Sequence, residues 1–178
     1  ETHDRLKEGR KILILSDRRE HLKVIKAKLD ELPNYTSGFY LGGMKEKDLN
    51  ETETKNVILG TFSMASEGFD CKYPLDTIIL TSPKTNIEQA VGRILRQEAK
   101  DRKFVPLIID ILDEFSMFGK QGQKRIKFYQ KNKYTMEIYV DNILQEEESQ
   151  KVNEKSSKKK TGKFKQTPVE ELDFLPDD

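Results

Sequence analysis

The sequence has only one cysteine, no tryptophan and no long hydrophobic run. The scarcity of cysteine and the absence of a long hydrophobic run exclude several classes of protein. Cys71 cannot form an intrachain disulfide by itself, and no group of Cys and His residues has zinc-site spacing. No apolar stretch approaches the length that spans a bilayer, and the charged residues 1–11 lack the core of a signal peptide. We therefore expect an intracellular protein, cytoplasmic or nuclear, with no membrane contact and no metal site in this chain.

Neither sign of charge predominates in the sequence. As many as 35% of residues are charged, but the formal net charge is only +1. Net charge therefore does not identify a partner. Residues 145–165 are almost all Glu, Gln, Ser and Lys, which cannot bury enough surface to order a chain. We expect a domain over residues 1–142 and a flexible charged tail over 143–178. Lysines 158–160 suit phosphate attraction, nuclear import or simple solvation, and the acidic end of the tail could bind a protein partner.

Apolar runs alternate with helical patterns between residues 11 and 132. The expected strands are residues 11–15, 37–41, 56–59, 77–80 and 104–111. The expected helices are residues 18–32, 45–54, 63–67, 86–98 and 120–132. This order predicts an α/β fold in which a mainly parallel sheet has helices on both faces. Ligands of such sheets bind beyond the carboxyl ends of the strands, so the segments of interest begin at Ser16, Gly42, Thr61 and Thr81.

Residues 89–96, Gln-Ala-Val-Gly-Arg-Ile-Leu-Arg, place polar side chains on one face of an expected helix. Gln89, Arg93 and Arg96 are separated by four and three residues, and Gly92 lets a neighbouring element approach closely. Arginine suits phosphate because its planar guanidinium donates two hydrogen bonds at fixed geometry. The spacing alone equally describes the solvated basic face of an amphipathic helix.

The same segment resembles motif VI of superfamily 2 helicases, Gln-x-x-Gly-Arg-x-x-Arg. Three companions occur in the order of that family. Residues 14–19 resemble motif IV, residues 41–44 resemble the Gly-Gly turn after the second strand, and residues 61–70 resemble motif V. The resemblance covers about residues 11–110 and implies a RecA-like fold, the second of the two such domains in these proteins. Residues 82–96 further resemble helicases of large DNA viruses and phages.

For the nucleotide, the resemblance implies ATP with Mg²⁺, whose metal ligands are expected on an N-terminal RecA-like domain of the same protein. Arg93 and Arg96 would be arginine fingers that reach ATP across the cleft, and Gln89 would position the γ-phosphate or the attacking water. Gly68 and Asp70 would lie on the nucleotide side, with Asp70 near the ribose. Taken singly, Gly68 is equally a helix C-cap and Asp70 a turn residue.

For the nucleic acid, the resemblance implies a track of phosphate contacts that holds one strand without reading its sequence. Its members are Ser16, Arg19, Gly42, Gly43 and Thr61. Structural alternatives exist, since Thr61 could only cap a helix, the glycines could only form a turn, and Arg19 could be a solvated helix residue. DNA is the expected strand, from the viral and phage resemblance alone.

No phosphate loop of the form Gly-x-x-x-x-Gly-Lys-Ser/Thr occurs in the sequence. Residues 107–114 imitate a Walker B strand, but they follow motif VI, and we interpret them as the last strand with a polar exit. The chain should therefore not hydrolyse ATP alone. Our first hypothesis is the C-terminal motor domain of an ATP-dependent helicase or translocase. The alternative is a nucleic-acid-binding or regulatory module that keeps the fold. The third and weakest hypothesis is an enzyme whose chemistry lies entirely within this chain, because no pair of a nucleophile and a base supports it. His3 and His21 are expected at the surface.

Overall fold

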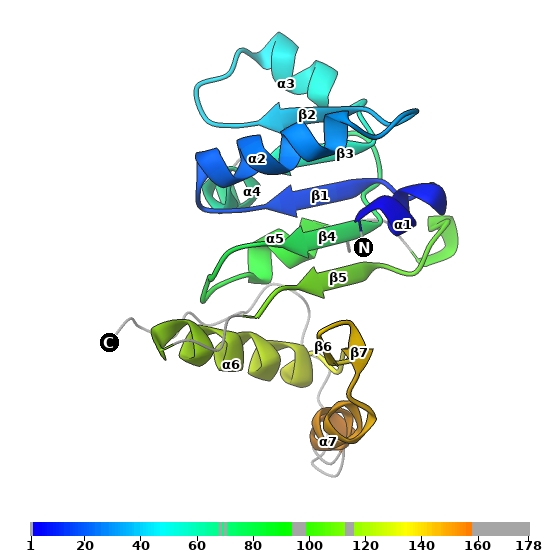
Figure 1. Ribbon diagram of the computed structural model, residues 1–178, viewed down its shortest axis with the longest axis vertical. Helices are drawn as coiled ribbons and strands as arrows, with labels where there is room; N and C mark the ends of the chain where they lie inside the picture. The colour runs from blue at the N-terminus through cyan, green and yellow to red at the C-terminus, as the bar shows by residue number, and fades with distance from the viewer. Residues whose placement is uncertain (1, 68, 70, 94–98, 113–115, 158–178) are drawn as a thin grey trace. The chain divides into compact units, whose positions relative to one another are not determined.

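The computed structural model describes residues 2–67, 69, 71–93, 99–112 and 116–157. The chain forms two compact units, Glu1–Ile126 and Lys127–Asp178. The first unit contains a five-stranded sheet and the second a two-stranded sheet (Figure 1). Every residue assigned to a motif above belongs to the first unit.

The strands of the first unit are all parallel and lie in the order β2-β3-β1-β4-β5. They are β1 (Ile12–Leu15), β2 (Ser37–Tyr40), β3 (Val57–Gly60), β4 (Thr77–Leu80) and β5 (Leu107–Asp110). The last residues of neighbouring strands pair with one another, since Leu15 lies beside both Gly60 and Leu80. Tyr40 and Asp110 extend the row to the outer strands. The five expected strands are confirmed, and their carboxyl ends form one continuous edge.

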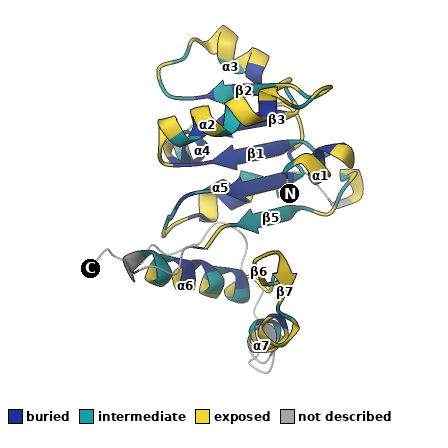
Figure 2. Cartoon of the chain, viewed as in Figure 1, coloured by how far each residue is buried: buried dark blue, intermediate teal, exposed yellow. Residues whose placement is uncertain are grey.

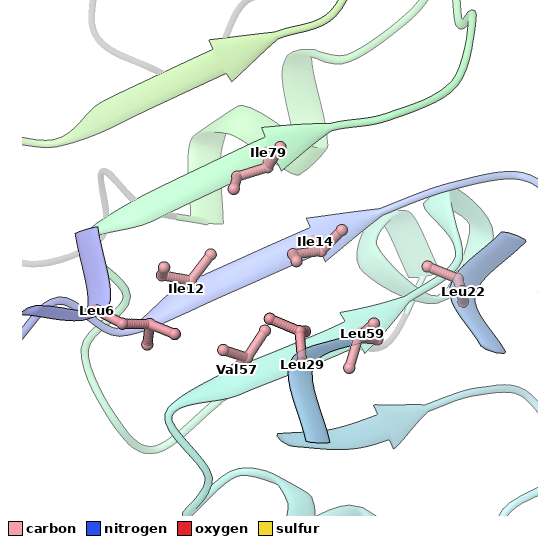
Figure 3. Packing of buried hydrophobic residues seen from close by; sticks show 8 residues of the cluster. All are labelled: Leu6, Ile12, Ile14, Leu22, Leu29, Val57, Leu59 and Ile79. Carbon is pink, nitrogen blue, oxygen red and sulfur yellow. The ribbon is translucent and has the colours of Figure 1, made fainter. Parts of the chain in front are cut away.

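The three middle strands, β1, β3 and β4, are buried along their whole length. Alternate residues of a strand point to the same face. Ile12 and Ile14 accordingly pack in one cluster with Leu22 and Leu29 of α2 (Arg19–Asp30) (Figure 3). The other buried members of this cluster are Leu6, Val57, Leu59 and Ile79. The intervening strand residues fill the opposite face, so the apolar runs make a sheet that must be covered on both sides.

Helices cover both faces, which confirms the expected fold class. The helix α2 lies on one face, and α4 (Phe62–Glu67) and α5 (Glu88–Gly92) lie on the other (Figure 1). The remaining helices of the first unit are α1 (Thr2–Lys7), α3 (Glu46–Thr52), the 3₁₀ helix η2 (Ala99–Asp101) and α6 (Ser116–Lys131), which runs on into the second unit. Burial decreases from the middle strands toward α3 and β5 (Figure 2). Within the described ranges, no helix is both long and apolar enough to cross a bilayer.

The helix expected over residues 86–98 is present as α5. Its N-cap is Ile87 rather than Thr85 or Asn86, although Asn86 Oδ1 still accepts a hydrogen bond from the Glu88 N–H (3.2 Å). Residues 94–98 lie outside the described residues. The described residues therefore include the start of α5, where motif VI begins, close to the end of β4.

The second unit contains a hairpin and a helix, which reach into the segment that composition predicted as a flexible tail, and the flexibility of that tail stays a prediction. A hairpin of β6 (Tyr139–Val140) and β7 (Ile143–Leu144) follows α6, and α7 (Glu146–Ser157) follows the hairpin. The hairpin turn is tight because Asp141 and Asn142 both have positive φ, 50° and 63°. Such angles are typical of a two-residue type I′ turn.

Hydrogen bonds between polar side chains and the main chain tie α7 to the segment before the hairpin. Asn153 donates from Nδ2 to Met136 O (2.8 Å) and accepts at Oδ1 from the Met136 N–H (2.9 Å). Ser149 Oγ accepts from the Ile138 N–H (2.9 Å). Hydrogen bonds of this kind cannot be predicted from the hydropathy of the sequence. The boundary between the two units, after Ile126, consequently differs from the boundary at residue 142 that composition suggested.

Candidate nucleic-acid and nucleotide interface

The carboxyl edge of the sheet carries the motif residues. Residues 16–19 follow β1, residues 41–43 follow β2, Thr61 follows β3, and the loop 81–87 follows β4 and leads into α5. Because neighbouring strands end at the same level, segments far apart in sequence meet at this edge. The edge is the place where parallel α/β sheets bind ligands.

Ser16, the first residue after β1, is fully buried. Its hydroxyl lies 3.2 Å from His21 Nδ1 and accepts a hydrogen bond from the Arg18 N–H (3.2 Å). The structure thus gives this hydroxyl an internal role in shaping the start of α2. A phosphate contact by Ser16 stays a prediction, and it requires a change at this buried position. His21 is half-buried against Ser16, contrary to the surface position expected for it, whereas His3 is exposed.

Arg19 and the Gly-Gly turn come from different strand exits and touch one another. Arg19 Nη2 donates to Gly42 O (3.0 Å). A Cβ added at Gly42 would lie 3.8 Å from that nitrogen and 3.6 Å from Met64 Sδ, which are ordinary contacts. Gly43 has φ +88°, a conformation that side chains disfavour, and it faces open space. The turn therefore presents exposed main chain beside an exposed guanidinium.

Thr61 lies at the start of α4 and is 9% exposed. Its Oγ1 is 3.1 Å from Ser63 Oγ, and the Met64 N–H donates to it at 3.5 Å. The second distance is long for an N–H to oxygen bond. The helix cap of the structural alternative is thus present but weak, and a phosphate contact by the same hydroxyl stays a prediction.

The helix α5 turns a polar face outward. Gln89 is exposed, whereas Ala90 and Val91 are buried. A Cβ added at Gly92 would meet nothing within 4 Å, so the close neighbour expected at this glycine is not found among the described residues. The face that carries Gln89 and Gly92 is accordingly open.

Arg93, directly after α5, contacts the end of α4. Its Nε donates to Ala65 O (2.9 Å) and its Nη2 donates to Ser66 O (3.1 Å). Carbonyls in the last turn of a helix lack partners within that helix, and a cation there is favoured by the helix dipole. Arg93 therefore joins the motif VI helix to the motif V helix inside the domain.

Three of the predicted site residues, Gly68, Asp70 and Arg96, lie outside the described residues. Phe69, between the first two, is 2% exposed, and its ring packs edge-on against Tyr40 with the centroids 4.7 Å apart. The aromatic position of motif V is thus anchored on the end of β2. No role beyond a place in the motif could be predicted for Phe69, because burial against another strand exit is a tertiary property.

A groove of about 690 Å³ opens at the same edge, between the β1 and β4 exits. Its lining includes Arg18, His21, Val24, Pro83 and Phe118. The β4 exit is tied to the β1 exit, since Ser82 Oγ accepts a hydrogen bond from the Asp17 N–H (2.9 Å). The groove combines charged and apolar side chains, and no sequence motif predicted it.

Asp110, the last residue of β5, is used inside the fold. Its Oδ2 lies 2.8 Å from Arg125 Nε of α6, and the two side chains are 10% and 1% exposed. This pairing agrees with the interpretation of residues 107–114 as the last strand. Residues 113 and 114 lie outside the described residues.

Side chains with a shifted pKa lie away from the carboxyl edge. Burial lowers the pKa of Lys11, at the amino end of β1. A hydrogen bond from Lys26, followed by one from Ser37, lowers the pKa of Asp30 at the end of α2. No group of three His, Cys, Asp or Glu in the described part of the chain could hold a metal ion. The carboxyl edge instead gathers Arg, Thr, Gln and glycine main chain, which are groups that bind phosphate.

The fold is RecA-like, and the order of the motifs is similar to that of the second RecA-like domain of superfamily 2 helicases and related ATPases. Solved structures share this fold. The C-terminal domain of the DEAD-box protein Dbp5 is 14% identical, with a TM-score of 0.53 over 72% of this chain and 77% of that chain. The SWI2/SNF2 ATPase core of Sulfolobus solfataricus is 18% identical, with a TM-score of 0.52 over 72% of this chain and 27% of that one.

In sequence, the chain is similar to viral proteins, as the narrower resemblance predicted. A protein of Acanthamoeba polyphaga mimivirus, provisionally named an ATP-dependent RNA helicase, is 42% identical over 134 residues, which are 74% of this chain and 25% of that protein. A protein of African swine fever virus with the same provisional description is 33% identical over 93 residues, which are 52% of this chain and 18% of that protein. The chain thus spans a quarter or less of these relatives. No protein-family model matches it.

Proposed function

We propose that this chain is the C-terminal motor domain of an ATP-dependent nucleic-acid helicase or translocase. One observation supports this most directly. The contact of Arg19 with Gly42 lies at the carboxyl edge, and Arg93 contacts the end of α4, a helix that begins at the same edge directly after β3. The loops and helices that leave this one edge thus carry both the proposed strand contacts and the proposed nucleotide contacts.

On the nucleotide side, Arg96 and Arg93 act as arginine fingers toward an ATP bound by an N-terminal RecA-like domain, which also holds the Mg²⁺. Gln89, on the open face of α5, positions the γ-phosphate or the attacking water, and Gly68 and Asp70 contact the nucleotide. A guanidinium supplied across such a cleft can accelerate phosphoryl transfer by roughly 10³- to 10⁵-fold. Arg93 must share or exchange its two carbonyl contacts when it meets a phosphate.

On the nucleic-acid side, Arg19 and the main chain of Gly42 and Gly43 hold the phosphates of one strand. Thr61 and, after a local change, Ser16 extend the track. Contacts of this kind position a strand and carry no base specificity. When the two RecA-like domains close on ATP and open after hydrolysis, this edge shifts along the strand.

The strand that this domain binds is either DNA or RNA. The viral and phage resemblance favours DNA, whereas the viral relatives carry names of RNA helicases. RNA is told from DNA at its 2′-hydroxyl, and the phosphate contacts proposed here do not use that group. We therefore propose single-stranded nucleic acid as the ligand and DNA as the preferred form, and we place the protein inside the cell at viral replication or transcription sites.

The alternative is a non-motor module that binds nucleic acid with the same fold. The two functions separate in one ATPase assay on the full-length protein that contains this chain, with single-stranded DNA and RNA of equal length. A motor shows turnover that rises with at least one strand, and the larger increase names the strand. Binding of either strand without turnover would establish the alternative instead. This chain alone should show no turnover with either.

A further inference from the structure

Arg125 of α6 is the largest fully buried side chain that no motif accounts for, with 1% of its surface exposed. Its guanidinium has three partners from two strand exits. Nε donates to Asp110 Oδ2 (2.8 Å), Nη1 to Lys84 O (2.7 Å) and Nη2 to Ile111 O (3.4 Å). A buried charge is tolerated when it is paired and hydrogen-bonded in this way.

The shortest of these bonds reaches the loop that leads into motif VI. Lys84 lies in the loop 81–87, and Ile87, three residues later, is the buried N-cap of α5. The Ile87 carbonyl accepts the hydrogen bond from Val91 N–H (2.8 Å) that belongs to the first turn of α5. The bond from Arg125 therefore acts within three residues of the point where the orientation of α5 is set.

The side chain of Lys84 joins the same point to the other motifs. Its Nζ lies 3.4 Å from Asp17 Oδ1 within motif IV and 5.7 Å from the centroid of the Phe62 ring at the start of α4. Lys84 is therefore held through its carbonyl by α6 and through its ammonium group by the exits of β1 and β3.

We propose that Arg125 is a positioning residue for the motor reaction: it clamps the β4–α5 loop at Lys84 O and thereby fixes the direction in which α5 presents Gln89 and Arg93. This inference rests on the proposed function. Arg125 touches neither ATP nor nucleic acid. Displacement of groups by about 1 Å through a distant substitution can lower a rate by on the order of a hundred-fold.

The test variant is Arg125→Lys, which keeps the charge beside Asp110 but lacks a fork that spans all three acceptors. The matched control is Lys11→Met. Lys11 is a partly buried cation that, like Arg125, holds two carbonyls, Glu53 O (2.6 Å) and Lys55 O (2.7 Å), but it lies at the amino edge of the sheet. Both variants are compared with the parent well below their melting temperatures.

Two readouts are needed. In this chain, hydrogen–deuterium exchange of residues 84–92 should become faster in Arg125→Lys and stay unchanged in Lys11→Met. In the full-length protein, Arg125→Lys should lower kcat by about ten- to a hundred-fold with KM for ATP nearly unchanged. Combined with Arg93→Ala, Arg125→Lys should lower kcat little further, because the two residues act through the same helix.

Exchange over 84–92 that matches the parent, or a fall in kcat no larger than in Lys11→Met, would overturn the clamp. A fully additive double variant would show that Arg125 acts elsewhere than through α5. Should Arg125→Lys not fold, Asp110→Asn keeps the shape of the partner, weakens its hold on the guanidinium, and should give the same exchange pattern to a smaller degree. An inactive parent would refute the proposed function and the catalytic part of the clamp, and exchange would still decide whether Arg125 holds the loop.

Discussion

At the amino edge of the sheet, polar groups are joined to one another, whereas at the carboxyl edge several of them are left at the surface. Lys11 shows the first arrangement. Its Nζ donates to two carbonyls, and its main-chain N–H donates to Asp76 Oδ2 (3.1 Å). At the carboxyl edge Arg19, Gly43 and Gln89 are exposed. The difference indicates that the amino edge stabilises the fold and that the carboxyl edge is available for ligands, and the predictions below test this contrast.

The largest effect is expected from Arg96→Ala in the full-length protein. An arginine finger at this position would stabilise charge that develops in the transition state, so kcat should fall by roughly 10³-fold or more while ATP binding stays largely intact. Steady-state kinetics and a binding titration with labelled ATP measure the two quantities. Lys28→Ala, on the exposed side of α2, is the control. A kcat within a few-fold of the parent would show that the motif VI assignment is wrong.

At the amino edge we expect a substitution to lower stability and to leave ATP turnover unchanged. Lys11→Met leaves two carbonyls without their donor, and the free energy of unfolding should fall by roughly 2 kcal/mol. ATP turnover measured below the melting temperature should not change. Urea unfolding of this chain gives the stability, and a turnover loss in the still-folded variant would abolish the contrast between the edges.

Lys11 also predicts a dependence on pH. Burial lowers its pKa in the folded chain from the ordinary value of 10.5. Between the lowered pKa and 10.5 the unfolded chain binds more protons than the folded chain, so the free energy of unfolding should rise with pH across that window. Subtracting the curve of Lys11→Met should isolate this rise. Equal slopes for the parent and the variant would contradict the assigned burial effect.

The two neighbouring glycines should respond differently to alanine. Gly43→Ala forces a side chain into φ +88° and should lower stability by about 1–2 kcal/mol. Gly42→Ala meets only ordinary contacts, so its stability should stay near that of the parent. The added methyl group at Gly42 stands beside the Arg19 guanidinium and should still weaken binding of single strands. Unchanged binding by Gly42→Ala would remove the turn from the proposed track.

Thr61→Val keeps the side-chain shape and removes the hydroxyl. If Thr61 holds a strand phosphate, stimulation of the ATPase by single strands should fall while basal hydrolysis changes little. If Thr61 is only a helix cap, the variant should lose up to about 1 kcal/mol of stability and keep normal stimulation. A melting curve followed by a titration of single-stranded DNA against the ATPase rate separates the two roles.

The smallest effect is expected from deletion of residues 143–178. The strands and helices of the first unit, Glu1–Ile126, do not include these residues. The melting temperature of the sheet should therefore change by only a few degrees, as followed by circular dichroism. A large drop would show that the segment stabilises the first unit.

The strands β1, β3, β4 and β5 could be predicted from the sequence because their positions are mostly runs of branched apolar residues. β5 is shorter than expected since Pro106 has no N–H to donate to the ladder, and the strand begins only at Leu107. Residues of the candidate site could be predicted only where they belong to a family motif. The burial of Arg125 could not be foreseen, because its acceptors come from two distant strand exits. The buried hydroxyl of Ser16 depends equally on tertiary contacts.

The central claim is that α5 reaches an ATP held outside this chain. A photoreactive group on the γ-phosphate of ATP, bound to the full-length protein with single-stranded nucleic acid, tests it directly. After irradiation and digestion, labelled peptides should include residues 89–96, and an excess of ATP should prevent the labelling. Labelling confined to regions outside this chain, in an enzyme that still hydrolyses ATP, would contradict the claim.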